Sequence, residues 1–313
     1  MKKILLSTFL LFSLGQCSKN EASDPSNESG IIKVFGNPIA EKPFPGDYTF
    51  FKDASYGNKV QNKLDLLLPK SENLKGVVLY FHGGSFLFGS KEDLYQSPSK
   101  EFIIALLTSN IAVINAEYTF IDDPLSEGVF TALEEGSEVI RFTEENASLL
   151  SIPPQKIILA GVSAGAGIAQ WNGFQSDSNS SIAGVLATIA QSTYDLYDWQ
   201  TIFPEFSITA LRNEFVELDD LFLQFYNGEA TEEKRTLLDY RGFMDANDPP
   251  LYVYNPVYEE TLLNSEGNLD FNILFHSVKH ADYLRLKALE VGQEFSGAYQ
   301  ESPEQFVIRI LSQ

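Results

Sequence analysis

The sequence predicts an α/β fold, in which a mostly parallel central sheet carries helices on both faces and a helical cap is inserted late in the chain. Three observations lead to this fold. Apolar runs of strand length alternate with amphipathic helical patterns through most of the 313 residues. The runs at 76–84 (GVVLYFHGG) and 155–163 (QKIILAGVS) are almost continuously apolar, as in parallel strands buried on both faces. The acidic, aromatic and helical block at 194–248 interrupts the alternation, which indicates the cap.

The individual elements follow from the period of the apolar residues. Strands are expected at 47–54 and 62–70, which form an opening hairpin, and then at 76–84, 111–118, 155–163, 182–191, 249–256 and 294–299. Helices are expected at 98–109, 128–150, 164–174, 280–295 and 306–313. A composition that is 44% hydrophobic is sufficient to bury a core of this size.

The first 16 residues are typical of a signal peptide, with two lysines before an apolar run that is too short to span a membrane. The stretch LGQC that follows resembles a bacterial lipobox, and Cys17 is the only cysteine of the chain. We therefore expect Cys17 to be lipidated and residues 17–46, rich in Ser, Asn, Glu, Pro and Gly, to form a flexible tether ahead of a domain at 47–313. Ser18 favours the outer membrane of a bacterial envelope by resemblance to enterobacterial lipoproteins.

The composition excludes several classes of function. A formal charge of −21 repels phosphate backbones, so nucleic acid is not expected as a partner. A single cysteine allows no internal disulfide. No metal-ligand spacing, phosphate loop or dinucleotide fingerprint is found, and no metal or cofactor is expected.

The candidate nucleophile is Ser163, in the G-x-S-x-G pattern Gly161–Gly165. The pattern follows a buried strand and opens a helix, which is the context that a nucleophilic serine on a tight turn requires. The small residues around Ser163 allow the helix and the strand to approach each other closely. A helix that begins beneath the serine favours the negative charge that develops during acyl transfer.

A second motif, His82-Gly83-Gly84-Ser85, follows the strand at 76–84. Together with the serine motif, it makes residues 47–313 resemble the α/β-hydrolases, in the esterase and lipase branch that carries H-G-G-G. The resemblance implies that the backbone N–H groups of Gly83, Gly84 and Ala164 form an oxyanion hole. It also implies that His82 supports the oxyanion loop and is not the base.

The same resemblance sets the order of the remaining partners as serine, then acid, then histidine. The loop after the final expected strand contains no histidine, so His276 and His280, in FHSVKHADYLRL, are the remaining candidates for the base. Both are expected near the carboxyl edge of the sheet, where Ser163 emerges. We favour His280 slightly, because the first turn of a helix holds a side chain more rigidly than a loop does.

The acid that orients this histidine is expected in the loop after the strand at 249–256. Glu259 and Glu260 are the nearest carboxylates in that loop, and Glu266 and Asp270 lie further along. A glutamate can perform this role, because the task is to orient the imidazole and balance its charge.

These residues predict a serine hydrolase that cleaves small-molecule carboxylic esters through an acyl-enzyme on Ser163. A peptidase is a weaker possibility, because amide cleavage demands a competent acid for the leaving amine. The alternative is a binding module that keeps the hydrolase fold after catalysis has weakened or been lost, tethered to the membrane through its lipid alone. The missing C-terminal histidine favours that alternative, whereas the intact serine turn and oxyanion loop argue against it.

Overall fold

The computed structural model describes residues 25–313 except 72, 176–179, 259–260, 265 and 267–268. Within this part of the chain, eight strands form one sheet in the order β1-β2-β4-β3-β5-β6-β7-β8. The strands are β1 (Tyr48–Ser55), β2 (Lys63–Pro69), β3 (Gly76–Phe81), β4 (Ile111–Ala116), β5 (Ile157–Val162), β6 (Ile182–Thr188), β7 (Leu251–Tyr254) and β8 (Phe295–Gly297). β2 runs antiparallel to both β1 and β4, and the remaining pairs are parallel. The predicted fold class is confirmed.

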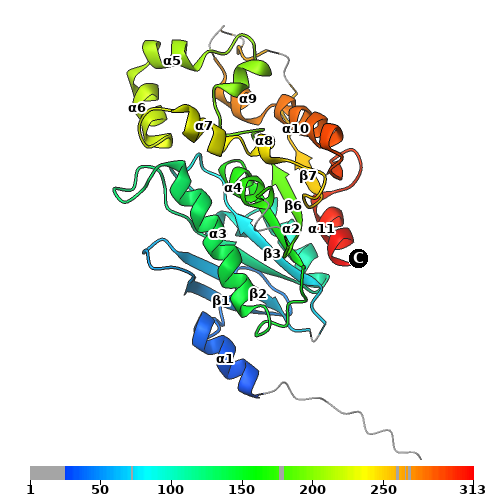
Figure 1. Ribbon diagram of the computed structural model, residues 1–313. Helices are drawn as coiled ribbons and strands as arrows, with labels where there is room; N and C mark the ends of the chain where they lie inside the picture. Colours follow the sequence, from blue (N-terminus) through cyan, green and yellow to red (C-terminus); the bar gives the residue numbers. More distant parts are fainter. Residues whose placement is uncertain (1–24, 72, 176–179, 259–260, 265, 267–268) are drawn as a thin grey trace, which may run out of the picture.

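Helices cover both faces of this sheet (Figure 1). They are α1 (Pro25–Phe35), α2 (Ser99–Thr108), α3 (Val129–Asn146), α4 (Ala164–Gly173), α5 (Ile208–Glu214), α6 (Val216–Phe225), α7 (Glu232–Leu238), α8 (Tyr240–Phe243), α9 (Phe271–His276), α10 (Val278–Val291) and α11 (Pro303–Leu311), with 3-10 turns η1 (Lys91–Tyr95) and η2 (Asp198–Thr201). Alternate residues of a strand face opposite sides of the sheet. Leu79 of β3 thus packs in the core under α3, α4 and α10, whereas Val78 and Tyr80 pack under α2 and α11.

The start of the domain differs from the expected tether. Phe35, at the end of α1, is 2% exposed and packs its ring against Phe51 and Phe142. Phe44 is buried against Tyr48. The prediction of a flexible tether is therefore wrong for residues 25–46, because the burial of these aromatic side chains outweighs the polar composition of the segment. Cys17 and the predicted signal peptide lie outside the described residues.

The segment predicted to form a cap leaves the sheet after β6 and returns at β7. It contains η2 and α5 to α8, which lie above the carboxyl ends of the parallel strands together with α9 (Figure 1). A separate hydrophobic cluster joins Trp199 and Phe203 of this segment to Leu274 of α9. None of the helices in the described chain has both the length and the apolar character that a membrane crossing requires.

Candidate active site

Ser163 lies on the sharp turn between β5 and α4, with φ 51° and ψ −116°. This left-handed conformation is uncommon for a residue with a side chain, and it exposes the hydroxyl at the carboxyl edge of the sheet. The glycines of the motif are required by the close packing around the turn. A Cβ at Gly161 would lie 2.2 Å from the carbonyl of Gly165, and a Cβ at Gly165 would lie 2.1 Å from the carbonyl oxygen of Phe81.

His276 is the histidine that meets this serine. Its Nε2 lies 3.1 Å from Ser163 Oγ, although the two residues are 113 positions apart in the chain. Its Nδ1 lies 3.0 Å from Oδ1 of Asn272, one helical turn earlier on α9. Because an amide oxygen only accepts, Nδ1 carries the proton and donates it to Asn272. Nε2 is therefore free to accept the proton of the serine hydroxyl, as a general base must.

Two side chains, those of Asp270 and Asn255, stabilise α9 and the residue that follows it. Asp270 caps the helix, its carboxylate accepting hydrogen bonds from the N–H groups of Asn272 and Ile273. Asn255, directly after β7, donates through its amide to the carbonyl oxygens of Ala190 and Ser277, at 2.7 and 3.0 Å. The Asn255 side chain therefore ties the residue that follows His276 to the loop after β6, next to the strand that carries Ser163.

The surroundings of His276 suit a base. Burial lowers the pKa of the His276 imidazole below its ordinary value of 6.5, because the charged form is poorly solvated there. The ring is therefore neutral at pH 7 and can accept a proton.

His280 takes a different position, and the slight preference for it as the base is corrected by the structure. Its ring is completely buried and packs edge-on against Trp199 and Phe203. Nδ1 accepts a hydrogen bond from Ser192, and Nε2 donates to the carbonyl oxygen of Leu274 at 2.8 Å. Burial lowers the pKa of His280 to about 4, so the ring is neutral and fully bonded. A residue in the first turn of α10 is held rigidly, as expected, but it points into the core.

The carboxylate expected to orient this histidine stays a prediction. Glu259 and Glu260 lie outside the described residues. The group that accepts from His276 is the amide of Asn272, and its side chain is exposed. The sequence signal for Asn272 is weak: an asparagine four positions before a histidine, which a helix places on one face. Glu301, in the loop after β8, forms an ion pair with Arg309 at 2.7 Å.

The oxyanion loop runs beside the serine. A Cβ at Gly83 would lie 3.5 Å from Ser163 Cβ, so this glycine is adjacent to the candidate nucleophile. Gly84 has φ +122°, and Ser85, in the place of a last glycine, adopts φ +54°. Within the described residues, no protein group accepts a hydrogen bond from the backbone N–H of Gly83, Gly84 or Ala164. These three donors are therefore available to a ligand.

His82 supports this loop from behind. Its Nδ1 lies 2.6 Å from the carbonyl oxygen of Gly83, and its Nε2 lies 3.2 Å from a carboxylate oxygen of Glu117. Both partners are hydrogen-bond acceptors, so the ring links the carbonyl group of Gly83 to the carboxylate of Glu117. The ring stacks on Tyr118 at 4.3 Å, and the Tyr118 hydroxyl donates to the His82 carbonyl oxygen. These contacts link the loop to the residues that follow β4.

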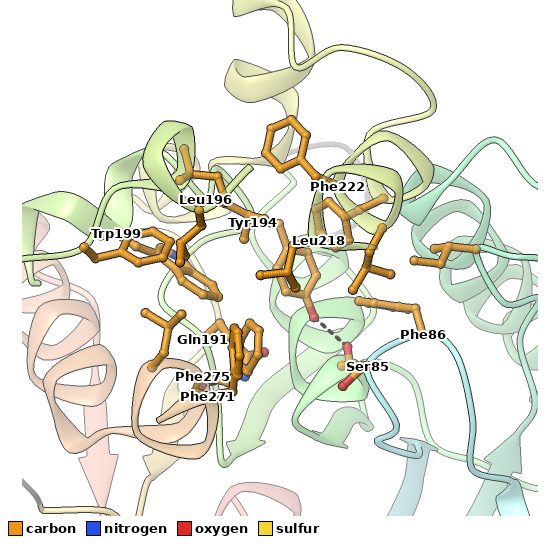
Figure 2. Close-up of a pocket in the computed structure, with 18 of the residues that line it drawn as sticks. Ser85, Phe86, Gln191, Tyr194, Leu196, Trp199, Leu218, Phe222, Phe271 and Phe275 are labelled. Atoms are coloured by element: carbon orange, nitrogen blue, oxygen red, sulfur yellow. Dashed lines mark hydrogen bonds between the residues drawn. The ribbon is translucent and has the colours of Figure 1, made fainter. Parts of the chain in front are cut away.

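A cavity of about 140 Å³ opens above Ser163 and Ala164, between the cap and α9 (Figure 2). At about 30 Å³ for each water molecule, this volume holds roughly five of them. Among the described residues, no group of three or more His, Cys, Asp or Glu side chains is placed to hold a metal ion. Ser163 and Ala164 border this cavity, and His276 meets Ser163 through the 3.1 Å contact.

Similar proteins share this architecture. Over 116 residues, the chain is 34% identical to the isoprenylcysteine alpha-carbonyl methylesterase ICME of Arabidopsis thaliana; the match covers 36% of this chain and 25% of that protein. The structure of a truncated carbohydrate esterase from gut microbiota matches with a TM-score of 0.63 at 11% identity, covering 88% of this chain and 100% of that one. Esterase B from Lactobacillus rhamnosis matches with a TM-score of 0.57 at 14% identity, covering 87% and 79%. At these identities, the two structures show a shared fold.

The family model of BD-FAE matches residues 64–253. This range begins in β2, contains both the oxyanion loop and the serine turn, and ends in β7, before α9 and His276. The resemblance to the α/β-hydrolase esterases that the two motifs predicted is thereby confirmed. Because the match covers more than half of the chain, the protein belongs to the BD-FAE family of α/β-hydrolase esterases.

Proposed function

We propose that the protein hydrolyses carboxylic esters of small molecules, with Ser163 as the nucleophile, His276 as the general base and acid, and Asn272 as the group that orients His276. The observation that carries this proposal is the 3.1 Å contact between Ser163 Oγ and His276 Nε2. It supplies the base that the loop after β8 lacks. The named functions of the similar proteins, all of them esterases, support the same reaction class.

The reaction proceeds in two halves. Ser163 Oγ attacks the ester carbonyl carbon while its proton passes to His276 Nε2, and the carbonyl oxygen becomes an oxyanion. The N–H groups of Gly83, Gly84 and Ala164 donate hydrogen bonds to that oxyanion. When the tetrahedral intermediate collapses, the carbon–oxygen bond to the alcohol breaks, and the alcohol takes the proton from His276. Water then attacks the acyl-enzyme with the same proton transfers and releases the carboxylic acid and free Ser163.

Asn272 gives this triad a distinct character. The amide holds the Nδ1–H tautomer of His276, but it supplies no negative charge to balance the imidazolium that forms in the transition state. The exposed side chain of Asn272 also allows water to compete for the same hydrogen bond. The leaving group of an ester needs less help from the acid than an amine does, so this triad suits esters better than peptides. The alternative of a binding module loses its main support, which was the absence of a base.

The direct test is labelling of the purified protein with a fluorophosphonate probe, which reacts with an activated serine. We expect one equivalent of probe on Ser163, located by peptide mapping, and no labelling of a folded Ser163→Ala variant. A wild-type protein that stays unlabelled and hydrolyses no ester would contradict the proposal and favour the binding module.

We further propose the anchor that the N-terminal sequence predicts, with lipid on Cys17 and the bacterial envelope as its location. A single acyl chain binds a membrane only marginally, so stable anchoring needs the several chains of a bacterial lipoprotein. We expect Cys17→Ser to move the full-length protein from the membrane fraction to the soluble fraction or to block its processing, as judged by fractionation. Unchanged membrane partition of the variant would refute the anchor.

A further inference from the structure

We propose that the ester substrate carries one extended, uncharged, apolar group, which binds in the cavity between the cap and α9. This inference rests on the proposed function of Ser163. It adds the chemical class of the group that the enzyme recognises.

The first argument is the surface of the cavity. Its lining is almost wholly aliphatic and aromatic, with contributions from the oxyanion loop, the cap and α9, among them Phe86, Leu196, Leu218, Phe222, Phe271 and Phe275. Figure 2 shows Leu218 and the two α9 phenylalanines bordering the same cavity, near Ser85 and Tyr194. An apolar chain that binds there is transferred from water to an apolar surface. This transfer is favourable in proportion to the apolar area buried.

The second argument is that three of the hydrogen-bond donors in the lining are already used. The Tyr194 hydroxyl donates to the carbonyl oxygen of Ala164 at 2.7 Å, and the Trp199 indole N–H donates to Thr193 at 2.9 Å. The Gln191 amide donates to the carbonyl oxygen of Phe275 at 2.8 Å. A sugar ring in the cavity would lose hydrogen bonds to water and find these donors engaged, which costs binding free energy.

The third argument concerns charge. Arg212 is the charged side chain among the described lining residues, and its guanidinium is held by the carboxylates of Asp219 and Glu229. The same guanidinium lies 4.1 Å from the centre of the Phe222 ring. A substrate carboxylate would therefore lie near a cation that is already neutralised, so the free energy of its desolvation would not be compensated.

The two sides of α9 connect the cavity to the catalytic pair. Phe271 and Phe275 border the cavity, with their rings stacked 6.0 Å apart, while His276 contacts Ser163 and Asn272 bonds to the other nitrogen of the His276 ring. A chain in the cavity thus contacts the helix that carries the base. The binding energy of the chain can hold that helix in the reactive position. Binding of the chain then raises kcat as well as affinity.

The experiment compares two series of esters on the wild-type protein. One series is p-nitrophenyl acetate, butyrate, hexanoate and octanoate, and the other is n-alkyl acetates from ethyl to octyl, so the apolar group is tested on the acyl side and on the alcohol side. Each methylene buried contributes up to about fourfold. We expect kcat/KM to rise more than about tenfold from the two-carbon to the six-carbon member in one series, in line with that contribution. Mono-p-nitrophenyl adipate, which ends in a carboxylate, should react at least about tenfold more slowly than the hexanoate.

A matched pair of variants on α6 ties the preference to the cavity. Leu218 lines the cavity, whereas Leu223 lies on another side of the same helix and borders a polar surface hollow. The quantity compared is the ratio of kcat/KM for the six-carbon ester to kcat/KM for the two-carbon ester of the same series. Leu218→Asp should lower this ratio about tenfold, and Leu223→Asp should leave it unchanged. Leu218→Gln, which adds no charge, gives a smaller drop in the same direction and serves if the aspartate variant does not fold.

The outcomes separate the two proposals. Two-carbon members that react as well as the longer members in both series, or a folded Leu218 variant with an unchanged ratio, would overturn the apolar-group inference while leaving Ser163 catalysis intact. Failure to hydrolyse any ester in a Ser163-dependent way would instead overturn the proposed function.

Discussion

Ser163→Ala and His276→Ala are each expected to lower kcat for p-nitrophenyl esters by about 10⁴- to 10⁶-fold, the range seen when one member of a cooperating catalytic set is removed. Alanine at 163 removes the nucleophile. Alanine at 276 leaves the serine hydroxyl without the acceptor that now lies 3.1 Å away. Because the two residues act in one proton transfer, the double variant should be no slower than the slower single variant. Steady-state kinetics on the purified proteins measures all three.

His280→Gln is the control that decides which histidine is the base. His280 is buried, and its two ring nitrogens bond to Ser192 and Leu274, so its loss should mainly lower stability. We expect the folded variant to keep kcat within about tenfold of the wild type, because the proton transfer itself does not use this ring. A His276→Ala protein that remains active while His280→Gln is inactive would reverse the assignment.

The pH profile gives an independent measure of His276. Protonation destroys the base, so kcat/KM should fall as the pH falls through the pKa of His276, and burial places that pKa below 6.5. Asn272→Asp puts a carboxylate beside Nδ1, which favours the charged imidazole and raises its pKa. The acid limb of this variant should therefore lie at higher pH than that of the wild type. Identical midpoints would show that Asn272 does not contact the working base.

Gly84→Ala is expected to lower kcat by about 10²- to 10³-fold, as the loss of one oxyanion donor does. Gly84 has φ +122°, and a Cβ at this position would lie 1.7 Å from the carbonyl oxygen of Phe88. That oxygen belongs to the backbone, so the oxyanion loop must move to accept the new atom. The movement displaces the N–H groups of Gly83 and Gly84 from the oxyanion.

Gly36→Ala is the matched control for backbone strain. Gly36 also has a positive φ, +81°, but an added Cβ would have nothing within 4 Å. The control should cost about 1–2 kcal/mol of folding free energy, from the left-handed conformation alone, and leave kcat unchanged. The two variants are compared by thermal unfolding and by kcat on the same ester. A folded Gly84→Ala protein with wild-type kcat would exclude this loop from the reaction.

The sheet, the serine turn and the His82–Ser85 loop could be predicted from the sequence alone, because each depends on local patterns. Continuous apolar runs specify buried parallel strands, and Gly161, Gly165 and Gly84 stand where the backbone leaves no room for a Cβ. The loop after the last strand visibly lacked a histidine. Its absence directed attention to the two other histidines of the sequence, His276 and His280.

Local patterns could not show which of those histidines meets the serine, or which group bonds to the other side of its ring, because both depend on the packing of distant segments. His276 and His280 are one helical turn apart in spacing, but Ser277 ends α9 and begins α10, so the two rings point in different directions. One reaches Ser163 across 113 residues of chain, and the other fills a space between Trp199 and Phe203. α9 has only six residues, so no periodic pattern in the sequence predicts it. Its position depends on the cap and on Asn255. Docking of Phe35 and Phe44 likewise depends on surfaces far away in the sequence, because long-range packing outweighs local composition.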